Sequence, residues 1–433
     1  MAEDCVFKVF TVDERCMTAV EEVKRLYMSR GEWAREVSEG KMFGVLVYEG
    51  GYLAAFSGTL GGKTVQEGFV PPVFDSVSGG GGYFKREEAE ISAINGRIAA
   101  YESVGLRGEA GRMVAELRGE RRVRSRALQG WLFDNYVFVN GRGVRRSLTD
   151  IFAPYGGAIP SGSGDCCGPK LLQAALLEGI RPLAMVEWNS ADGGFCRPCR
   201  QRCRPILEFM LDGLNAERDP ELVAYESVMS RLRVLYEDEW LWVVVKPGGL
   251  LSVPGKEFLP SVLSMTGGLE VHRLDMDTSG LMLVAKGAEV QRALRLAFER
   301  REVYKVYDAL LEREMVVGSE GVIDLALRAD VANRPRQVVD VVGGKVAVTR
   351  YQVVGNMGGC AHVRLFPQTG RTHQLRVHCA SAEGLGNAIV GDRLYGVGAE
   401  GLRLNASELR FVHPVTGRVM EFRCSAEWLD ALG

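Results

Sequence analysis

The chain reads His272-Arg273-Leu274-Asp275-Met276-Asp277-Thr278-Ser279-Gly280 where a polar segment passes into the apolar run Leu281-Met282-Leu283-Val284-Ala285-Lys286. Asp, Thr, Ser and Gly favour turns, and an apolar run of this length is typical of a β-strand. A turn of this kind presents charged groups at the mouth of a sheet, where an active site can form. On these residues alone, the two aspartates could equally serve only to shape a tight connection.

Three further segments change that balance. The 272–280 segment resembles the catalytic motif of the RluA-type RNA pseudouridine synthases, and the other motifs of that family follow in the family's order. They are Lys305-Val306-Tyr307-Asp308-Ala309, Gly370-Arg371-Thr372-His373-Gln374-Leu375-Arg376-Val377-His378 and Ile389-Val390-Gly391-Asp392-Arg393-Leu394-Tyr395-Gly396. The segment that starts at Lys246-Pro247-Gly248-Gly249 also resembles the opening strand and turn of the family, so the resemblance extends from about residue 232 to residue 421.

The resemblance implies an enzyme that isomerises specific uridines in ribosomal or transfer RNA to pseudouridine. It assigns catalysis to Asp275, with Tyr307 and Arg376 in the same site, and it implies no cofactor for the reaction. A single carboxylate can begin this chemistry either as a nucleophile or by abstracting a ribose proton, and both routes stay open. A carboxylate sheltered from water needs a nearby cation to stay ionised, and Arg376 is the candidate. Since no imidazole base is required, structural roles are expected for His272 and His373.

The substrate base cannot be reached inside a stacked helix, so the nucleotide must be flipped out. By resemblance, Arg273 is expected to fill the space that the flipped nucleotide leaves, a use suited to a flat guanidinium. Leu375 is expected to form a wall against the uracil. Arg371 and Lys246 are predicted to contact the RNA.

Strand-like and helix-like patterns predict the fold of the C-terminal half. Apolar runs at 241–247, 304–311 and 345–354 are typical of strands, and residues 288–300 have helical spacing. Strands and helices alternate without a strict β-α-β order. We therefore expect an α+β catalytic domain at 231–433 with a mixed, mostly antiparallel sheet flanked by helices. Thr372 is expected to cap a helix that starts at His373.

The N-terminal half, residues 1–230, is expected to form a separate α+β accessory domain with projecting helices. Its composition divides it into a β-rich part at 1–85, a helical arm at 86–129 and a cysteine-rich segment at 160–214. Arginines concentrate in the arm and just beyond it. A run of this kind is usually a solvated helix face, and contact with RNA phosphates is the alternative.

The chain has 433 residues, of which 46% are hydrophobic and 25% charged, and its formal net charge is −2. These values are typical of a globular protein and do not by themselves indicate RNA binding, which depends on local clusters of Lys and Arg. The N-terminal residues do not have the pattern of a signal peptide, and no apolar stretch is long enough for a membrane span. A cytoplasmic location without membrane contact is expected.

Five of the ten cysteines lie between residues 166 and 203. In a chain without a secretory signal they are better interpreted as free thiols or metal ligands than as disulfides. Two interpretations stay open: a structural zinc site, or reduced thiols in a basic turn. The candidates are Cys166, Cys167, Cys196, Cys199 and Cys203.

Two alternatives to the leading interpretation also stay open. The chain could be a non-catalytic RNA-binding or ribosome-assembly protein on the same fold, because fold alone does not establish turnover. Its N-terminal half could be a zinc-dependent protein-interaction module. The presence of Asp275, Tyr307 and Arg376 together favours the enzyme over the binder.

Overall fold

A computed structural model describes residues 6–74, 82–103, 109–155, 159–398 and 401–430 of the chain. It divides into two compact units, Met1–Pro220 with Lys256–Phe258, and Glu221–Gly255 with Leu259–Gly433. The division lies about ten residues before the boundary expected near residue 231. The reason is that the change in composition marks the first strand of the second unit, whereas that unit already begins in the preceding helix. In the described part of the chain, no helix combines the length and apolarity that crossing a membrane requires.

The first unit is built on a four-stranded antiparallel sheet in the order β2-β1-β5-β6. Its strands and helices are α1 (Met17–Met28), α2 (Ala34–Ser38), β1 (Met42–Tyr48), β2 (Gly51–Phe56), α3 (Tyr83–Ser103), α4 (Glu109–Asn135), β3 (Val137–Val139), β4 (Arg145–Ser147), α5 (Leu148–Phe152), α6 (Cys167–Leu177), β5 (Pro182–Asn189), β6 (Phe195–Cys196) and α7 (Arg204–Leu211).

The sequence predicted a separate β-rich module at 1–85, but the described residues of this range, 6–74 and 82–85, do not form one. Strand β1 pairs on one side with β2 and on the other with β5, more than 130 residues later in the chain. Helices α1 and α2 also lie within this segment. Val45 and Leu46, neighbours on β1, belong to separate apolar clusters, which is the alternation that a strand buried on two faces produces.

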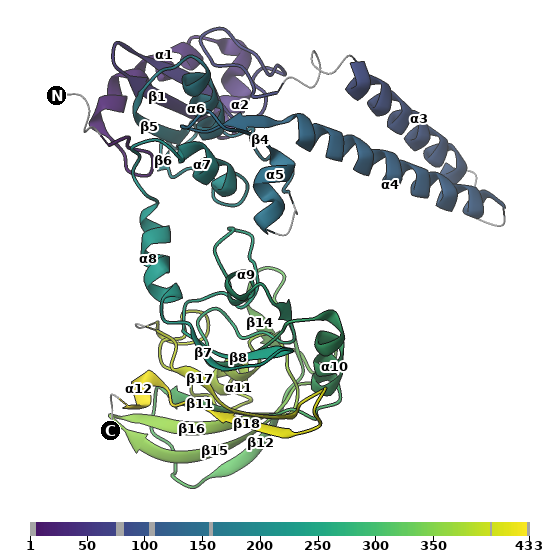
Figure 1. Cartoon of the computed structure of the whole chain (residues 1–433), viewed down its shortest axis with the longest axis vertical. Coiled ribbons are helices and arrows are strands. Elements are labelled where there is room, and N and C mark those ends of the chain that lie inside the picture. Colours follow the sequence, from purple (N-terminus) through teal and green to yellow (C-terminus); the bar gives the residue numbers. More distant parts are fainter. Residues whose placement is uncertain (1–5, 75–81, 104–108, 156–158, 399–400, 431–433) are drawn as a thin grey trace. The chain divides into compact units, whose positions relative to one another are not determined.

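The two long helices α3 and α4 run side by side (Figure 1). A small apolar cluster of Ile94, Ile98, Val114 and Leu117 joins them. Several arginines of α4 are engaged within this helical pair: Arg118 pairs with Glu102, and Arg124 pairs with Glu87 and Glu120. Part of the arginine-rich segment is therefore a solvated helix surface whose charges are paired within the two helices.

The second unit contains a ten-stranded sheet in the order β12-β15-β16-β11-β17-β10-β8-β7, with β18 paired to β17 and β9 to β10. Its elements are α8 (Pro220–Met229), β7 (Arg233–Glu237), β8 (Leu241–Lys246), α9 (Val262–Thr266), β9 (Leu269–Glu270), β10 (Ser279–Ala285), α10 (Ala288–Glu299), β11 (Tyr304–Leu311), β12 (Glu320–Asp324), β13 (Leu327–Ala329), β14 (Gln337–Val339), β15 (Val348–Met357), β16 (Cys360–Pro367), α11 (Gln374–Ala380), β17 (Leu404–Val412), β18 (Val419–Arg423) and α12 (Glu427–Asp430).

This sheet confirms the predicted α+β fold. Every pairing described within it is antiparallel except β10 with β17, so the sheet is mixed and mostly antiparallel. Figure 1 shows β16, β15 and β12 following one another toward one edge. Helix α10 buries Val290 and Leu294 in the apolar cluster around β8 and β10.

The parallel pairing at the centre of the sheet depends on a glycine. Gly280 has φ of 111°, and a Cβ atom there would collide with the backbone of Ala406 on β17. Only glycine combines this backbone angle with so close an approach. Strand β10 therefore lies directly against β17, which on its other side pairs with β11.

Candidate active site

Asp275 lies in a tight turn immediately before β10. The Thr278 N–H donates to the Asp275 carbonyl at 3.1 Å, which closes the turn predicted from the sequence. The backbone on each side of Asp275 is also held. Ser252 Oγ bonds both the N–H and the C=O of Leu274, and the Met276 carbonyl accepts from Gly249 N and Lys246 Nζ. The carboxylate is thus carried on a fixed backbone while its side chain stays about one-fifth exposed.

Arg376, on α11, is the nearest cation to that carboxylate. Its Nη1 atom lies 3.7 Å from Asp275 Oδ2. Its Nε and Nη2 atoms donate to the two oxygens of Asp392 at 2.7 and 2.6 Å. Asp392 is fully buried and also accepts the N–H groups of Leu394 and Tyr395. The guanidinium is therefore fixed in orientation, with Nη1 next to the Asp275 carboxylate.

His373 is the second group near the Asp275 carboxylate. The sequence analysis predicted a structural role for this histidine. Its Nε2 atom lies 3.9 Å from Asp275 Oδ2, and its Nδ1 atom is 2.8 Å from the hydroxyl of Tyr395. Burial lowers the pKa of His373, so the neutral ring is favoured. The residue has φ of 52°, an uncommon angle for a non-glycine residue that recurs at functional sites.

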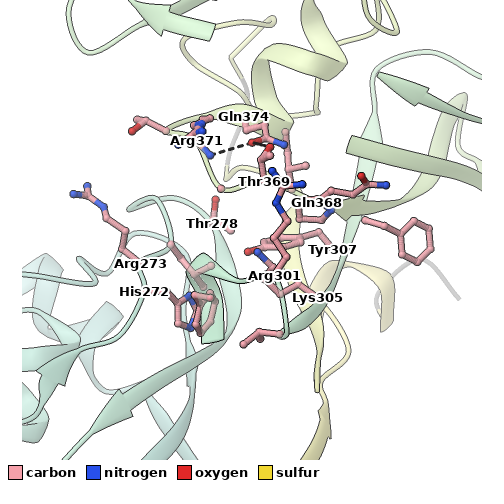
Figure 2. A pocket seen from close by; sticks show the side chains of 18 of the residues that line it. His272, Arg273, Thr278, Arg301, Lys305, Tyr307, Gln368, Thr369, Arg371 and Gln374 are labelled. Atoms are coloured by element: carbon pink, nitrogen blue, oxygen red, sulfur yellow. Dashed lines mark hydrogen bonds between the residues drawn. The ribbon is translucent and has the colours of Figure 1, made fainter. Parts of the chain in front are cut away.

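Helix α11 begins differently from the prediction. It starts at Gln374, the residue before it is His373 in the left-handed region, and no side chain caps the helix, so Thr372 is not the cap. The Gln374 side chain instead accepts the N–H of Arg371 and the hydroxyl of Thr369 (Figure 2). A left-handed residue turns the chain too sharply for the Thr372 hydroxyl to cap the helix.

Tyr307 lies on β11 where the register with β17 shifts between Val306 and Tyr307. A register shift of this kind redirects a side chain, here into the same cavity as Asp275. Burial raises the pKa of Tyr307 and the negative charge of Asp275 raises it further, so the phenol is neutral at physiological pH.

His272 has a structural role, as expected. Its Nε2 atom accepts the N–H of Leu283 at 3.0 Å, and its ring stacks on Phe298 with a centroid separation of 4.5 Å. Burial and, to a smaller extent, the charge of Lys305 together lower the pKa of His272 to about 3. The ring is therefore a neutral hydrogen-bond acceptor.

Lys246 does not contact RNA in this arrangement, and that prediction is corrected. Its side chain is completely buried, and Nζ donates to the carbonyls of Pro247, Leu250 and Met276 at 2.8–3.0 Å. Burial lowers its pKa to about 7, whereas the nearby Asp277 and Asp275 favour the charged form. The three carbonyls match the three donors of an ammonium group, so we assign Lys246 the charged form and a positioning role next to Asp275.

A cavity of about 1060 Å³ is lined by Asp275, Tyr307, His373 and Arg376 among other residues. Arg273, Arg371 and the buried Leu375 line it together with Asp275, Tyr307 and Arg376, so the structure brings together every predicted site residue except Lys246. Figure 2 shows His272 and Arg273 entering from the segment before β10, and Thr369, Arg371 and Gln374 from the segment that leads into α11. Arg273 is exposed, whereas Arg371 Nε is engaged with the Val346 carbonyl at 3.0 Å.

The wall of the cavity is strongly cationic. Seven Lys and Arg side chains line it against the carboxylates of Asp275, Glu299 and Glu302, although the whole chain has a net charge of −2. A cavity of this charge suits a polyanionic substrate, because phosphate binding depends on local clusters of cations. The cationic side chains are Arg273, Arg301, Lys305, Arg350, Arg371, Arg376 and Arg410.

Sequence reasoning missed two supporting residues, Asp392 and Tyr395. Both lie in the quoted segment Ile389–Gly396, but a carboxylate in a Gly-Asp turn looks like a turn former until its partner is known. A buried arginine needs a hydrogen-bond acceptor. A search for the acceptor of Arg376 could therefore have pointed to this segment.

Comparison with known proteins agrees with this cationic, carboxylate-bearing site. The sequence model of the family described as RNA pseudouridylate synthase matches residues 241–381. The dual-specificity RNA pseudouridine synthase RluA of Yersinia pestis is 42% identical over 208 residues, which cover 45% of this chain and 99% of that protein. The protein of the same name from Escherichia coli K12 is 38% identical over 231 residues, covering 50% of this chain and 99% of that protein.

The chain is therefore an RNA-modifying enzyme. It belongs to the RluA-type RNA pseudouridine synthases, as the motifs in the sequence predicted. Membership favours the enzyme over a non-catalytic binder on the same fold. Among solved structures, human RNA pseudouridylate synthase domain containing 1 shares 29% identity with a TM-score of 0.39 and covers 47% of this chain and 86% of its own.

Proposed function

We propose that Asp275 is the catalytic carboxylate with which the enzyme isomerises specific uridines in ribosomal or transfer RNA. The position of Asp275 is the observation that supports this proposal. Its carboxylate faces the cationic cavity, Arg376 Nη1 lies 3.7 Å from its Oδ2 atom, and hydrogen bonds hold the backbone on both sides of it. Of the three carboxylates that line this cavity in the described residues, Asp275 is the one paired with a buried guanidinium.

In this proposal each neighbour has a separate task. The bond between the ribose anomeric carbon and uracil N1 breaks, the retained base turns, and a new bond forms to carbon 5, which then loses its proton while N1 gains one. Asp275 begins the sequence from its ionised form, either by attacking the sugar or by removing a ribose proton. The neutral Tyr307 phenol and Leu375 hold the base, and Arg273 fills the gap that the flipped nucleotide leaves in the RNA.

The names of the relatives and the charge of the cavity support this proposed substrate class. The curated relatives are named as dual-specificity RNA pseudouridine synthases. Stable structured RNAs present loops whose bases can be extruded at low cost, and a cationic wall attracts their phosphates. Sequencing pseudouridine in ribosomal and transfer RNA from cells with and without the gene tests this directly. Sites that disappear with the gene support the proposal, whereas unchanged maps of both RNA classes contradict it.

Substitution of Asp275 tests the catalytic assignment. Asp275→Ala should abolish pseudouridine formation but keep RNA affinity within about tenfold of the wild type, because affinity comes from phosphate and stacking contacts spread over many residues. Asp277→Ala is the matched control. Asp277 lies two residues away, does not line the cavity and pairs loosely with the exposed Arg393, at 3.6 Å, so its removal should reduce turnover far less than the loss of Asp275. Turnover by Asp275→Ala would refute the assignment.

The proposed chemistry uses only protein side chains. Purified enzyme should convert uridine in a substrate RNA without any added nucleotide or redox cofactor. Brief exposure to a chelator should leave the initial rate unchanged, provided that the chain stays folded. An absolute requirement for an added cofactor would contradict the proposed route.

A further inference from the structure

Three cysteines from two separate segments of the sequence, Cys166 in one and Cys199 and Cys203 in the other, meet in the first unit. The sulfur atoms of Cys166, Cys199 and Cys203 all lie within 4.8 Å of one another. Cys166 immediately precedes α6, Cys203 immediately precedes α7, and Cys199 lies in the turn before α7. Helices α6 and α7 pack against each other, which brings the sulfur atoms together (Figure 1).

The other two cysteines of the segment are directed elsewhere. Cys167 is completely buried, and its sulfur lies 3.5 and 3.7 Å from the carbonyls of Met42 and Ala55 on the neighbouring strands. Cys196 is exposed, and its sulfur contacts the Gly194 carbonyl at 3.6 Å. The structure thus separates the five candidate cysteines into a cluster of three and two outsiders.

Backbone N–H groups point at two of the three sulfur atoms. Cys199 accepts backbone hydrogen bonds from Arg202 and Cys203, and Cys203 accepts one from Gly164. Cys166 and Cys203 occupy the N-cap positions of two helices, where the helix dipole stabilises negative charge. Three sulfur atoms so close together and largely sheltered from water form a ligand set that suits one thiophilic metal ion.

We propose that Cys166, Cys199 and Cys203 bind one Zn²⁺ ion. Zinc binds thiolate sulfur at about 2.3 Å in tetrahedral geometry, which places two ligand sulfurs about 3.8 Å apart, and the separations in the cluster need to change little to reach this value. The ion fastens the start of α6 to the turn before α7 and so stabilises the first unit.

Metal analysis tests this proposal on the full-length chain. Protein reduced, incubated with zinc and passed through a desalting column should retain about one zinc per chain. Cys199→Ser and Cys166→Ser should each lose most of that zinc. Cys196→Ser, three residues from Cys199, and Cys360→Ser, a partly buried thiol of the second unit, are matched controls that should keep it. Wild-type protein that retains no zinc, or a Cys196→Ser variant that loses it, would overturn the three-thiolate site.

A second measurement needs no variant and so does not depend on whether the serine variants fold. Iodoacetamide labelling followed by peptide mass spectrometry should show Cys166 and Cys199 protected when zinc is present and labelled after chelation. Cys196 should be labelled equally in both conditions because it is exposed. Equal labelling of Cys166 and Cys199 with and without zinc would refute the site. Thermal unfolding should also shift to lower temperature after chelation in the wild type but not in Cys199→Ser.

Discussion

Arg376 binds Asp392 with two of its guanidinium nitrogens, Nε and Nη2, and its third nitrogen, Nη1, stays available to a second carboxylate. The paired distances are 2.7 and 2.6 Å, and both side chains are almost completely buried. Such a bidentate contact fixes the plane of the guanidinium. Asp275 therefore faces a cation whose position is set by a residue that does not itself line the cavity.

Removing either member of this pair should damage the enzyme in a different way. Arg376→Met should abolish turnover, because Asp275 loses its nearby cation, and should lower the free energy of unfolding by roughly 3–5 kcal/mol, because Asp392 stays buried without its partner. Asp392→Asn should retain RNA binding but lose at least about tenfold in kcat, since the guanidinium is no longer held in one orientation. Single-turnover kinetics and thermal unfolding measure both effects, and full activity of Asp392→Asn would refute the positioning role.

Lys246 provides a test of positioning from the opposite side of Asp275. Lys246→Met should destabilise the chain by roughly 2–4 kcal/mol, because three buried carbonyls, including that of Met276, lose their donor. Turnover should fall with kcat affected more than KM, since the backbone of the catalytic turn shifts while the RNA-facing surface is unchanged. Lys345→Met, at an exposed position, is the control and should alter neither quantity appreciably. If Lys246 acted through RNA contact instead, KM would rise and stability would hold.

The buried His272 should make stability depend on pH. Its pKa in the folded chain is about 3, below the ordinary value of about 6.5, so between these values the unfolded chain binds a proton that the folded chain does not. Stability from this residue is complete above about pH 6.5 and is lost as the pH falls toward 3, by at most about 1.4 kcal/mol per pH unit.

The variant His272→Gln isolates this contribution. Glutamine can accept the Leu283 N–H without titrating. The unfolding temperature of the variant should therefore fall less steeply than that of the wild type as the pH is lowered from 7 to 5. Parallel curves for the two proteins would show that His272 does not titrate in this way.

Gly280 should not tolerate even one added carbon. Gly280→Ala introduces a Cβ atom against the Ala406 backbone at an unfavourable φ and should cost roughly 3 kcal/mol or more. Gly287→Ala is the matched control, because Gly287 has φ of −143° and nothing lies within 4 Å of the position of its Cβ. Thermal unfolding of the two variants measures the difference, and equal melting temperatures would contradict the close approach.

The sequence predicted best where local pattern and family motif coincide. Asp275 precedes β10, Tyr307 lies on β11 and Arg376 lies on α11. These motifs are up to about 100 residues apart in the sequence, and the fold brings the three side chains into one cavity. The role of Lys246 was predicted wrongly because a lysine at the end of an apolar strand is normally exposed. Only the three-dimensional contacts reveal the carbonyls around its ammonium group.

Long-range pairing limited the rest of the prediction. The partner of β1 is β5, which no local pattern could have joined to it. In the same way, five cysteines in one stretch gave no indication of which three converge, because that depends on the packing of α6 against α7.

The contact of β10 with β17 also sets an order of events during synthesis. Asp275 emerges from the ribosome about 130 residues before Leu404–Val412, the strand against which its own strand must lie. Contacts so distant in sequence form late, since the intervening chain must first be closed into a loop. A nascent chain that ends before β17 therefore carries every catalytic side chain but no assembled centre, and the enzyme becomes competent only when its C-terminal strands arrive.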